Sequence, residues 1–215
     1  MGVAGMSNPS VAAYGSISSL DENLAAQIVD VLVAAIAARG EASLVVSGGS
    51  SPIGFFQCLS RFDIAWQRVS IWLADERWVG AQDAQSNEKL VHTHLLQNFA
   101  AKARFMPLAG EHFSSGASAE QAALGLQQTH QHQSAFDLVI LGMGLDAHTA
   151  SLFPGISELV TGLDAASDSH FIATQSPAAP HQRISMTLAR LVNARQVYLH
   201  VTGQEKVAVL QDAWL

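Results

Sequence analysis

The sequence is poor in charged residues, and poorest in basic ones. Charged residues make up 13% of the 215 positions, and 11 Lys and Arg stand against 18 Asp and Glu, which gives a formal net charge of −7. Such a chain lacks the broad positive field with which proteins bind nucleic acid or anionic membranes. We therefore expect no nucleic-acid partner and no membrane partner, and any anionic ligand must be held by a local group of cations.

Cysteine and long apolar runs are also scarce. Cys58 is the single cysteine, which excludes an intramolecular disulfide framework and fits a reducing compartment. No run approaches the roughly 18 apolar residues of a membrane-spanning helix. The first residues lack the basic start and apolar stretch of a signal peptide. We expect a cytoplasmic protein with a flexible lead-in at 1–19 and one domain at 20–215.

Hydrophobic residues make up 49% of the chain, and helix and strand patterns alternate along it. This alternation predicts a three-layer α/β fold with a mainly parallel central sheet and helices on both faces. Helices are expected at 20–39, after Pro52, after Ser86, at 119–131, at 149–153, at 184–192 and around Lys206, and strands at 44–46, 69–74, 105–108, 136–141, 170–174 and 196–202.

Three polar motifs each follow a buried strand directly: Ser47–Ser51, Asp75–Arg77 and Gly142–His148. In open parallel sheets, ligands bind in the crevice outside the carboxyl ends of the strands. The motifs are far apart in sequence, but this geometry brings them to one edge of the sheet. We therefore expect one ligand site built from all three.

The first motif has the composition of a phosphate cradle. Gly48 and Gly49 allow the backbone to approach a ligand, Ser47, Ser50 and Ser51 supply hydroxyl groups, and the following helix offers free N–H groups. Pro52 suits the first helical position, with a serine before it as the cap. An ordinary strand-to-helix turn is the alternative, and no Gly-Lys-Ser/Thr follows that would make a Walker loop.

The second motif places Asp75, Glu76 and Arg77 after a strand. Charged residues at the end of a strand often only mark the point where the chain leaves the core and becomes exposed to solvent. In the functional interpretation, Asp75 orients a catalytic group or handles a proton, and Arg77 clamps an anion.

The third motif has the form Gly-x-Gly-x-x-Ala of a dinucleotide-binding loop. We discount that interpretation because Pro154-Gly155 interrupts the helix that would have to follow. Asp146 and His148 instead form a titratable pair at the ligand edge. An imidazole there suits general base catalysis near neutral pH, although a lone histidine at such a junction often only caps or fills space.

Other chemistries find less support. The pairs His92/His94 and His130/His132 have a spacing that points two rings of a helix in different directions. No Gly-x-Ser-x-Gly elbow is present, so a serine hydrolase triad is not expected. Arg183 and Lys206 are candidate anion ligands, and plain surface charge is the alternative for both.

The motifs resemble those of the 6-phosphogluconolactonases from about residue 20 to the C-terminus. The matching segments are Ser47–Pro52, Asp75–Arg77 with Ser86-Asn87, Leu141–Gly155, Arg183–Thr187, and Gly203 with Lys206, in this order. The resemblance implies hydrolysis of 6-phosphoglucono-δ-lactone to 6-phosphogluconate in the oxidative pentose phosphate pathway, with no metal or organic cofactor. It also implies the fold shared with glucosamine-6-phosphate deaminases and ribose-5-phosphate isomerases.

On this hypothesis, His148 takes a proton from the attacking water, and Asp75 or Asp146 orients its ring. Backbone N–H groups near Gly144, or the guanidinium of Arg77, stabilise the oxyanion. The substrate is a small sugar-phosphate lactone, and the protein is a monomer or a small homo-oligomer. The expected substrate-binding residues are Ser47, Gly48, Gly49, Ser50, Ser51, Asn87, Gly144, Arg183 and Lys206.

The sequence departs from the family pattern at Ala147, where the family usually has glycine, and by ending at Leu215, early in the helix of Lys206. We expect a slightly altered turn and a weaker sheet edge. Two other functions stay open. A deaminase or isomerase on the same fold typically carries tyrosine at the position of Arg77 and Asn-Glu-Pro near 152–154. A non-catalytic sugar-phosphate sensor would bind without turnover.

Overall fold

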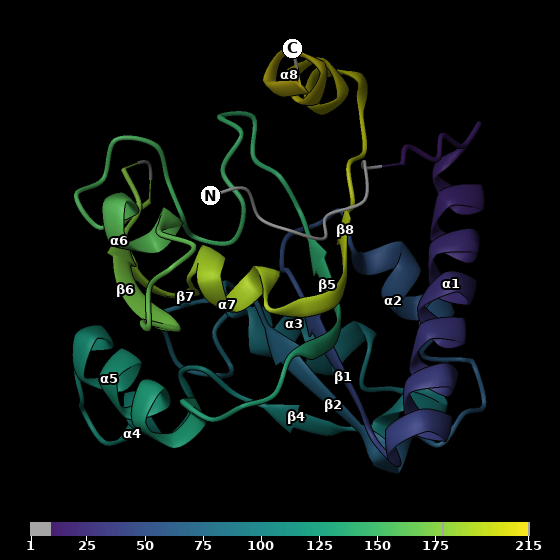
Figure 1. Ribbon diagram of the computed structural model, residues 1–215, viewed down its shortest axis with the longest axis horizontal. Helices are drawn as coiled ribbons and strands as arrows, with labels where there is room; N and C mark the ends of the chain where they lie inside the picture. Colours follow the sequence, from purple (N-terminus) through teal and green to yellow (C-terminus); the bar gives the residue numbers. More distant parts are fainter. Residues whose placement is uncertain (1–9, 178, 215) are drawn as a thin grey trace.

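A five-stranded, all-parallel sheet lies at the centre of the computed structural model, which describes residues 10–177 and 179–214 (Figure 1). The strand order is β4-β2-β1-β5-β8. The mainly parallel sheet predicted from the sequence is confirmed. Its strands are β1 Ala42–Val46, β2 Val69–Leu73, β4 Arg104–Met106, β5 Phe136–Leu141 and β8 Ala194–Leu199.

The inner strands are short and mostly apolar because both of their faces are covered. Every residue of β1, β2 and β5 is buried, as expected for parallel strands packed on both sides. In the register, Val46 lies beside both Leu73 and Ile140. The three strands therefore end level, and the loops that follow them leave the sheet at the same edge.

Helix α1, Ile17–Arg39, covers one side of this sheet. The Ser16 side chain caps it by accepting the Ser19 N–H, and Gly40 ends it with a φ of 81°. The helix predicted at 20–39 is confirmed with an earlier start, so part of the expected lead-in is helical; residues 1–9 of that segment lie outside the described residues.

The other helices are α2 Ile53–Leu59, α3 Asn87–His94, α4 Gly110–Ser114, α5 Ala119–His130, α6 Leu159–Leu163, α7 Leu188–Val192 and α8 Gln204–Trp214, with 3₁₀ turns at Trp66–Arg68 and Asn98–Lys102. Ser86 caps α3, and Ser118 and Gln121 form a capping box on α5. Within the described ranges, no helix is long and apolar enough to cross a membrane.

A second, antiparallel sheet in the order β3-β7-β6 was not expected. Its strands are β3 Asp75–Arg77, β7 Gln182–Met186 and β6 Phe171–Gln175. The helix predicted at 184–192 is therefore wrong in its first part: buried Ile184 and Met186 follow strand periodicity, and the helix begins only after the Thr187 cap. Asp75–Arg77 forms a strand with two buried residues, and it is not a solvent-exposed end of the preceding strand.

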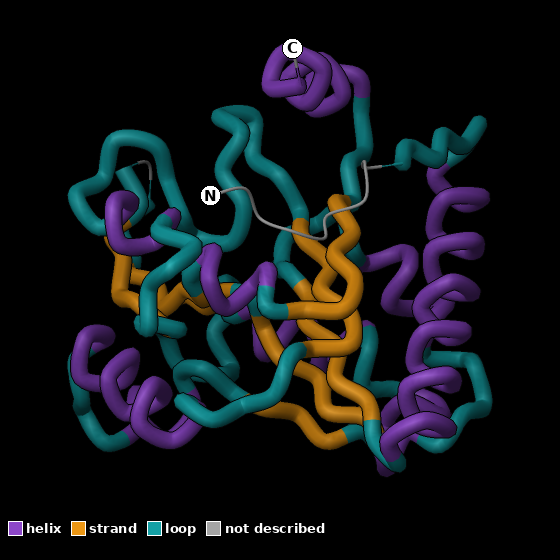
Figure 2. Tube along the Cα trace, in the orientation of Figure 1, coloured by secondary structure: helices purple, strands orange, loops and turns teal. Residues whose placement is uncertain are grey.

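The two sheets divide the molecule into layers (Figure 2). Helices α1 and α2 lie on one side of the parallel sheet, and the antiparallel sheet with α5 lies on the other side. Helix α8 stands above the carboxyl end of β8. The helix predicted at 149–153 is also wrong, because this segment forms turns between the two sheets.

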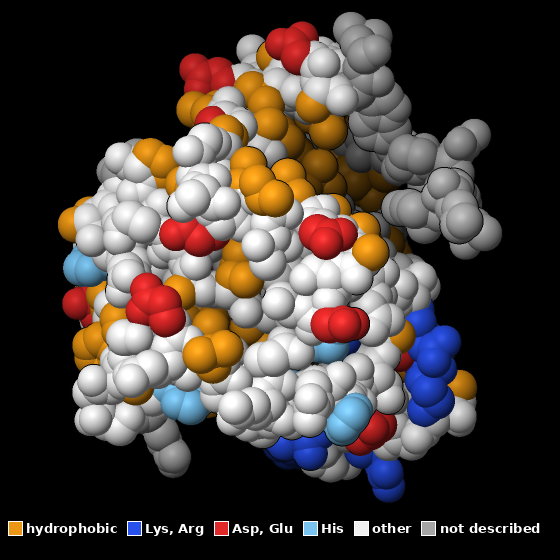
Figure 3. All heavy atoms as spheres, turned by 60° about the vertical axis from the view of Figure 1, so that its left-hand side comes forward, with side chains coloured by type: hydrophobic (Ala, Val, Ile, Leu, Met, Phe, Trp, Pro, Cys, Tyr) orange, Lys and Arg blue, Asp and Glu red, His pale blue; other side chains and the backbone are white. Residues whose placement is uncertain are grey.

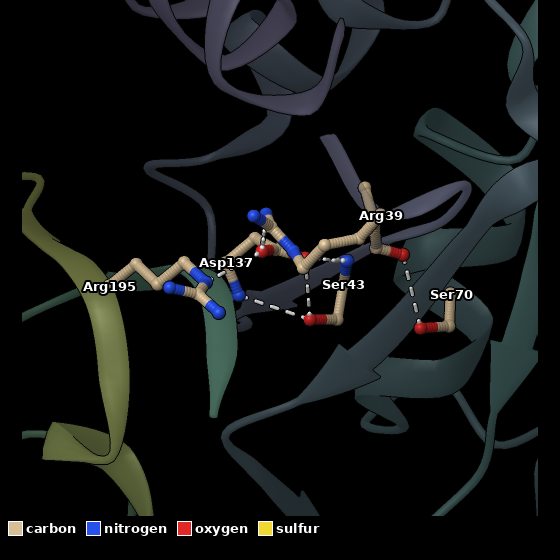
Figure 4. Close-up of polar contacts among 6 residues, drawn as sticks. Arg39, Ser43, Ser70, Asp137 and Arg195 are labelled. Carbon is tan, nitrogen blue, oxygen red and sulfur yellow. Dashed lines mark hydrogen bonds and ion pairs between the residues drawn. The ribbon is translucent and has the colours of Figure 1, made fainter. Parts of the chain in front are cut away.

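The opposite end of the parallel sheet is held by a buried carboxylate (Figure 4). Asp137 accepts hydrogen bonds from the Ser43 N–H at 2.8 Å and the Ser43 hydroxyl at 3.1 Å. It also pairs with Arg39 at the end of α1 and with Nε of Arg195, 3.4 Å away on β8. A buried charge with this many partners ties α1, β1, β5 and β8 together.

Charged and apolar side chains are distributed unevenly over the surface (Figure 3). In this view Lys and Arg lie along the lower edge, at the end of the molecule away from α8, whereas hydrophobic side chains gather below α8. Among the described residues on this face (Figure 3), no broad basic surface lies beside α8 that would attract an anion.

Candidate active site

A cavity of about 470 Å³ opens at the carboxyl ends of the parallel strands. All of the site residues predicted from the sequence line it, and the structure thus brings the three motifs together. They are Ser47, Gly48, Gly49, Ser50, Ser51, Asp75, Arg77, Asn87, Gly144, Asp146, His148, Arg183 and Lys206.

His148 lies against a carboxylate of its own loop. Its Nδ1 makes an ion-pair contact with Oδ1 of Asp146. Partial burial raises the pKa of the Asp146 carboxyl, but the hydrogen bond and charge of His148 outweigh this and lower it. With Nδ1 facing Asp146, Nε2 is the nitrogen left for other chemistry, which is the arrangement of an oriented catalytic imidazole.

Glycine is required at position 144 for this arrangement. A Cβ atom on Gly144 would overlap with the His148 ring and the Asp146 carboxylate. The Gly144 N–H donates to the His148 carbonyl at 2.9 Å and closes the loop on itself. The second glycine of the third motif therefore leaves room for the His148–Asp146 pair.

Ala147 adopts a left-handed backbone conformation with a φ of 64°. A Cβ atom makes this conformation unfavourable by roughly 1–2 kcal/mol relative to a right-handed one. The sequence predicted a slightly altered turn here, and the structure shows an alanine in a strained conformation at a position where the 6-phosphogluconolactonases usually have glycine.

We expect Ala147→Gly to raise the free energy of unfolding by about 0.5–1 kcal/mol, because glycine has no Cβ to strain. Urea denaturation monitored by circular dichroism measures this change. Ala166, an exposed turn residue outside the left-handed region, is the matched control, and Ala166→Gly should be destabilising. A destabilising Ala147→Gly would contradict the argument.

Asp75 is buried and does not face His148. Its Oδ2 accepts the Ser151 hydroxyl at 2.5 Å, and its exposed fraction is 7%. The sequence left Asp75 and Asp146 as alternative partners of the imidazole. The geometry favours Asp146, and it gives Asp75 a serine partner instead.

Glu76 has a structural task that the sequence did not reveal. Its carboxylate accepts the backbone N–H groups of Asn87 at 2.8 Å and Glu88 at 2.7 Å, in the first turn of α3. Burial raises the pKa of the Glu76 carboxyl, and these bonds oppose that effect. The sequence carried no signal of this task, because the N–H partners that a buried acid needs belong to α3, a later segment of the chain.

Asn87 lines the cavity but is engaged with the protein. Its Nδ2 donates to the Asp75 carbonyl at 2.9 Å. Its side chain also lies so close to Gly48 that a Cβ atom there would overlap with it. Asn87 therefore joins the glycine loop to β3. Position 48 has to be glycine because the Asn87 side chain occupies the space that a Cβ would need.

Arg77 and Arg183 are direct neighbours across the β3–β7 pair. Burial and the charge of Arg77 lower the pKa of the Arg183 guanidinium, while Asp75 and Glu76 raise it. In the described part of the chain, Nε of both arginines is buried without a hydrogen-bond partner. Two adjacent guanidinium groups that line the cavity have the positive charge and the donor groups to bind an anion.

The glycine loop leads into α2 differently from the prediction. No serine side chain caps α2. The carboxyl group of Asp21 on α1 lies against the first turn of α2, where Gly54 leaves room for it because a Cβ there would overlap with it. The predicted serine cap is wrong, since α2 begins at Ile53 without a hydrogen bond from a capping side chain. Gly49 takes a φ of 95°, which suits glycine.

Lys206 reaches the cavity from the first turn of α8. Beside it, His200 is 6% exposed, and burial together with the charge of Lys206 lowers the pKa of its imidazole. Sequence analysis missed His200, Phe153 and Ser176 as lining residues. His200 follows β8 directly, so its place at a strand end was a usable signal.

Phe153 contacts both halves of the site. Its ring centroid lies 4.5 Å from that of His148 and 5.9 Å from Cζ of Arg183. In the described part of the chain, no group of three or more His, Cys, Asp or Glu side chains could hold a metal ion. The chemistry supported by this arrangement is acid–base catalysis beside an anion-binding pair.

Comparison with known proteins agrees with this geometry. Residues 16–215 match the family model described as glucosamine-6-phosphate isomerases/6-phosphogluconolactonase. A protein of Pseudomonas putida named 6-phosphogluconolactonase is 42% identical over 195 residues, covering 91% of this chain and 79% of the relative. The chain belongs to this family. The resemblance inferred from the sequence motifs is thereby confirmed.

Solved structures of the glucosamine-6-phosphate isomerase/6-phosphogluconolactonase family have the same fold. A 6-phosphogluconolactonase from Shewanella baltica OS155 superposes with a TM-score of 0.87 at 43% identity, covering 93% of this chain and 84% of the other. A monomeric glucosamine-6-phosphate deaminase superposes with a TM-score of 0.72 at 16% identity, covering 93% and 84%. The deaminase likeness concerns the fold alone, and the predicted fold class is confirmed.

Proposed function

We propose that the protein is a 6-phosphogluconolactonase, which hydrolyses 6-phosphoglucono-δ-lactone to 6-phosphogluconate in the oxidative pentose phosphate pathway. The observation that carries this proposal is an oriented His148–Asp146 pair in the same cavity as the cations Arg77, Arg183 and Lys206. Relatives at about 40% identity carry this enzyme name. Hydrolysis of a phosphorylated lactone requires a base that activates the attacking water and cations that bind the negatively charged phosphate.

In the proposed mechanism, Nε2 of His148 removes a proton from water as the water oxygen attacks the lactone carbonyl carbon. Asp146, held at Nδ1, keeps the imidazole oriented and stabilises its positive charge. The tetrahedral intermediate then collapses with cleavage of the ring C–O bond. His148 returns the proton to the departing alkoxide, so the base is regenerated and one water is consumed.

The carbonyl oxygen becomes negatively charged during attack and needs donors that are already in place. Arg77, which lines the cavity, or backbone N–H groups next to Gly144 are proposed for this role; the Gly144 N–H itself donates to the His148 carbonyl. Each such donor typically contributes about 10²–10³ in rate. The proposed steps use groups of the chain and a water molecule, and no cofactor is assigned to them.

The phosphate is proposed to bind between the loop Ser47–Ser51 and the cations Arg183 and Lys206. Hydrogen bonds to charged groups are short and strong, so these residues suit a phosphate dianion. The helix α2 contributes less than the sequence suggested, because the carboxyl group of Asp21 already lies against its first turn.

The direct test follows acid release from freshly prepared 6-phosphogluconolactone, compared with the spontaneous hydrolysis of the same solution. We expect the protein to accelerate hydrolysis far above that background, by at least the 10⁶-fold typical of enzymes, once spontaneous loss is subtracted. Ammonia release from glucosamine 6-phosphate, with no effect on the lactone, would overturn the proposal in favour of a deaminase. Binding of both without turnover would indicate a sensor.

A further inference from the structure

The loop 142–155 carries His148 from the parallel sheet to the antiparallel one. It contains no helix or strand, and Ala147 and Ala150 in it have positive φ values of 64° and 50°. The path of such a segment is fixed by its side-chain tethers rather than by a regular hydrogen-bond ladder. The position of His148 therefore depends on what holds the loop at its far end.

Ser151 is the residue that holds it. It is completely buried; its hydroxyl donates to Oδ2 of Asp75 at 2.5 Å, and its N–H donates to the Ser185 hydroxyl at 3.1 Å. Asp75 and Ser185 face each other across β3 and β7. Ser151 is thus bonded to both strands. Its two partners, Asp75 and Ser185, are paired two positions along the strands from the Arg77–Arg183 pair.

We propose that Ser151 is a positioning residue that fixes the spacing between the base His148 and the anion-binding arginines by its bond to Asp75. This inference rests on the proposed lactonase function and deepens it. The serine acts through the loop and through the carboxylate, and it touches no reacting atom.

The choice of partner supports this role over simple packing. Buried serine hydroxyls are commonly satisfied by a nearby backbone carbonyl, as that of Ser185 is by Met186 at 3.0 Å. Ser151 instead bonds a carboxylate that lines the cavity. Without that bond, Asp75 would be free to turn towards Arg183 and compete with the substrate for its guanidinium.

The experiment compares Ser151→Ala with a matched serine outside the site. Ser43 is 8% exposed and donates its hydroxyl to the buried carboxylate of Asp137 at 3.1 Å, at the other end of the sheet. Ser151→Ala is expected to lower kcat/KM on the phosphorylated lactone roughly tenfold to hundredfold, the loss for a hydrogen bond to a charged group. Ser43→Ala should lower the urea midpoint and leave kcat/KM unchanged.

A double-mutant cycle with Asp75→Asn separates a positioning role from a purely structural one. It measures whether the effects of the two substitutions on kcat/KM are coupled. If the serine acts through Asp75, adding Ser151→Ala to Asp75→Asn costs at most about threefold more in kcat/KM. If the losses multiply in full, or Ser151→Ala equals wild type, the inference is overturned. Should Ser151→Ala not fold, Ser151→Cys, with a weaker donor of similar shape, takes its place in the cycle.

The failure of this inference and that of the proposed function are distinguishable. An inactive wild-type protein refutes the lactonase assignment. An active wild type with an equally active, folded Ser151→Ala or Ser151→Cys variant refutes the positioning role and leaves the lactonase intact.

Discussion

Replacing His148 with alanine is expected to lower kcat for lactone hydrolysis by about 10²–10⁴-fold, the usual contribution of a general base. The side chain lies at the cavity surface and pairs with Asp146, so its removal deletes the base without opening the core. The substrate's phosphate contacts stay in place, and KM should therefore change little. Steady-state kinetics with subtraction of spontaneous hydrolysis give both constants.

Two further variants make this result specific. Asp146→Asn keeps the shape of the side chain but removes the charge that stabilises the imidazolium, and it should cost less than His148→Ala. His132, exposed and outside the cavity, is the control, and His132→Ala should behave like wild type. An unchanged kcat in a folded His148→Ala protein would refute the assignment of the base.

The second large effect concerns the phosphate. Arg183→Gln and Lys206→Met are each expected to lower kcat/KM on 6-phosphogluconolactone by roughly tenfold to hundredfold, because each removes a charge-assisted contact with the dianion. On gluconolactone, which has no phosphate, the same variants should lose far less. The ratio of the two kcat/KM values, measured for each variant, isolates the phosphate contribution.

Arg104→Gln is the control for this comparison, since Arg104 is exposed on β4 and does not line the cavity. Its ratio should equal that of wild type. Equal losses on both substrates for Arg183→Gln would mean that the guanidinium serves another part of the reaction, such as the oxyanion. If a cation binds the phosphate, its removal must lower kcat/KM on 6-phosphogluconolactone more than on gluconolactone.

Much of the fold could be predicted because local patterns decide it. The run 136–141 is apolar except for Asp137 and forms β5 with the predicted bounds. Its polar continuation and the other two motifs reach one cavity, because parallel strands end at a common edge. The domain boundary and the prediction of a monomer or small homo-oligomer stay predictions.

The antiparallel sheet could not be predicted for a physical reason. Strand β3 has only three residues, all charged, and it exists because Asp75–Arg77 pairs with a distant segment of the chain. Local periodicity carries no information on such a pairing. The same limit applies to the helix predicted at 149–153, because Ser151 in this segment bonds to Asp75 and Ser185, which are distant in sequence.

In the site, residue types could be predicted but not their partners. The sequence left Asp75 and Asp146 as alternative partners of His148, and only the three-dimensional path of the loop distinguishes them. Glu76 and Ser151 escaped notice because each acts on another element of the protein. A side chain whose task is to hold a neighbour has no signature in its own segment.

No serine of the Ser47–Ser51 loop caps α2, and this has an effect on how the loop can change. A loop that must cap its own helix cannot lose its serines without losing stability, which is the usual compromise in active sites. Here the helix forms without a serine cap, and the carboxyl group of Asp21 on α1 lies against its first turn. The loop is thereby released from that compromise, so its ligand preference can be altered by substitution, in evolution or by design, while the helix behind it stays formed.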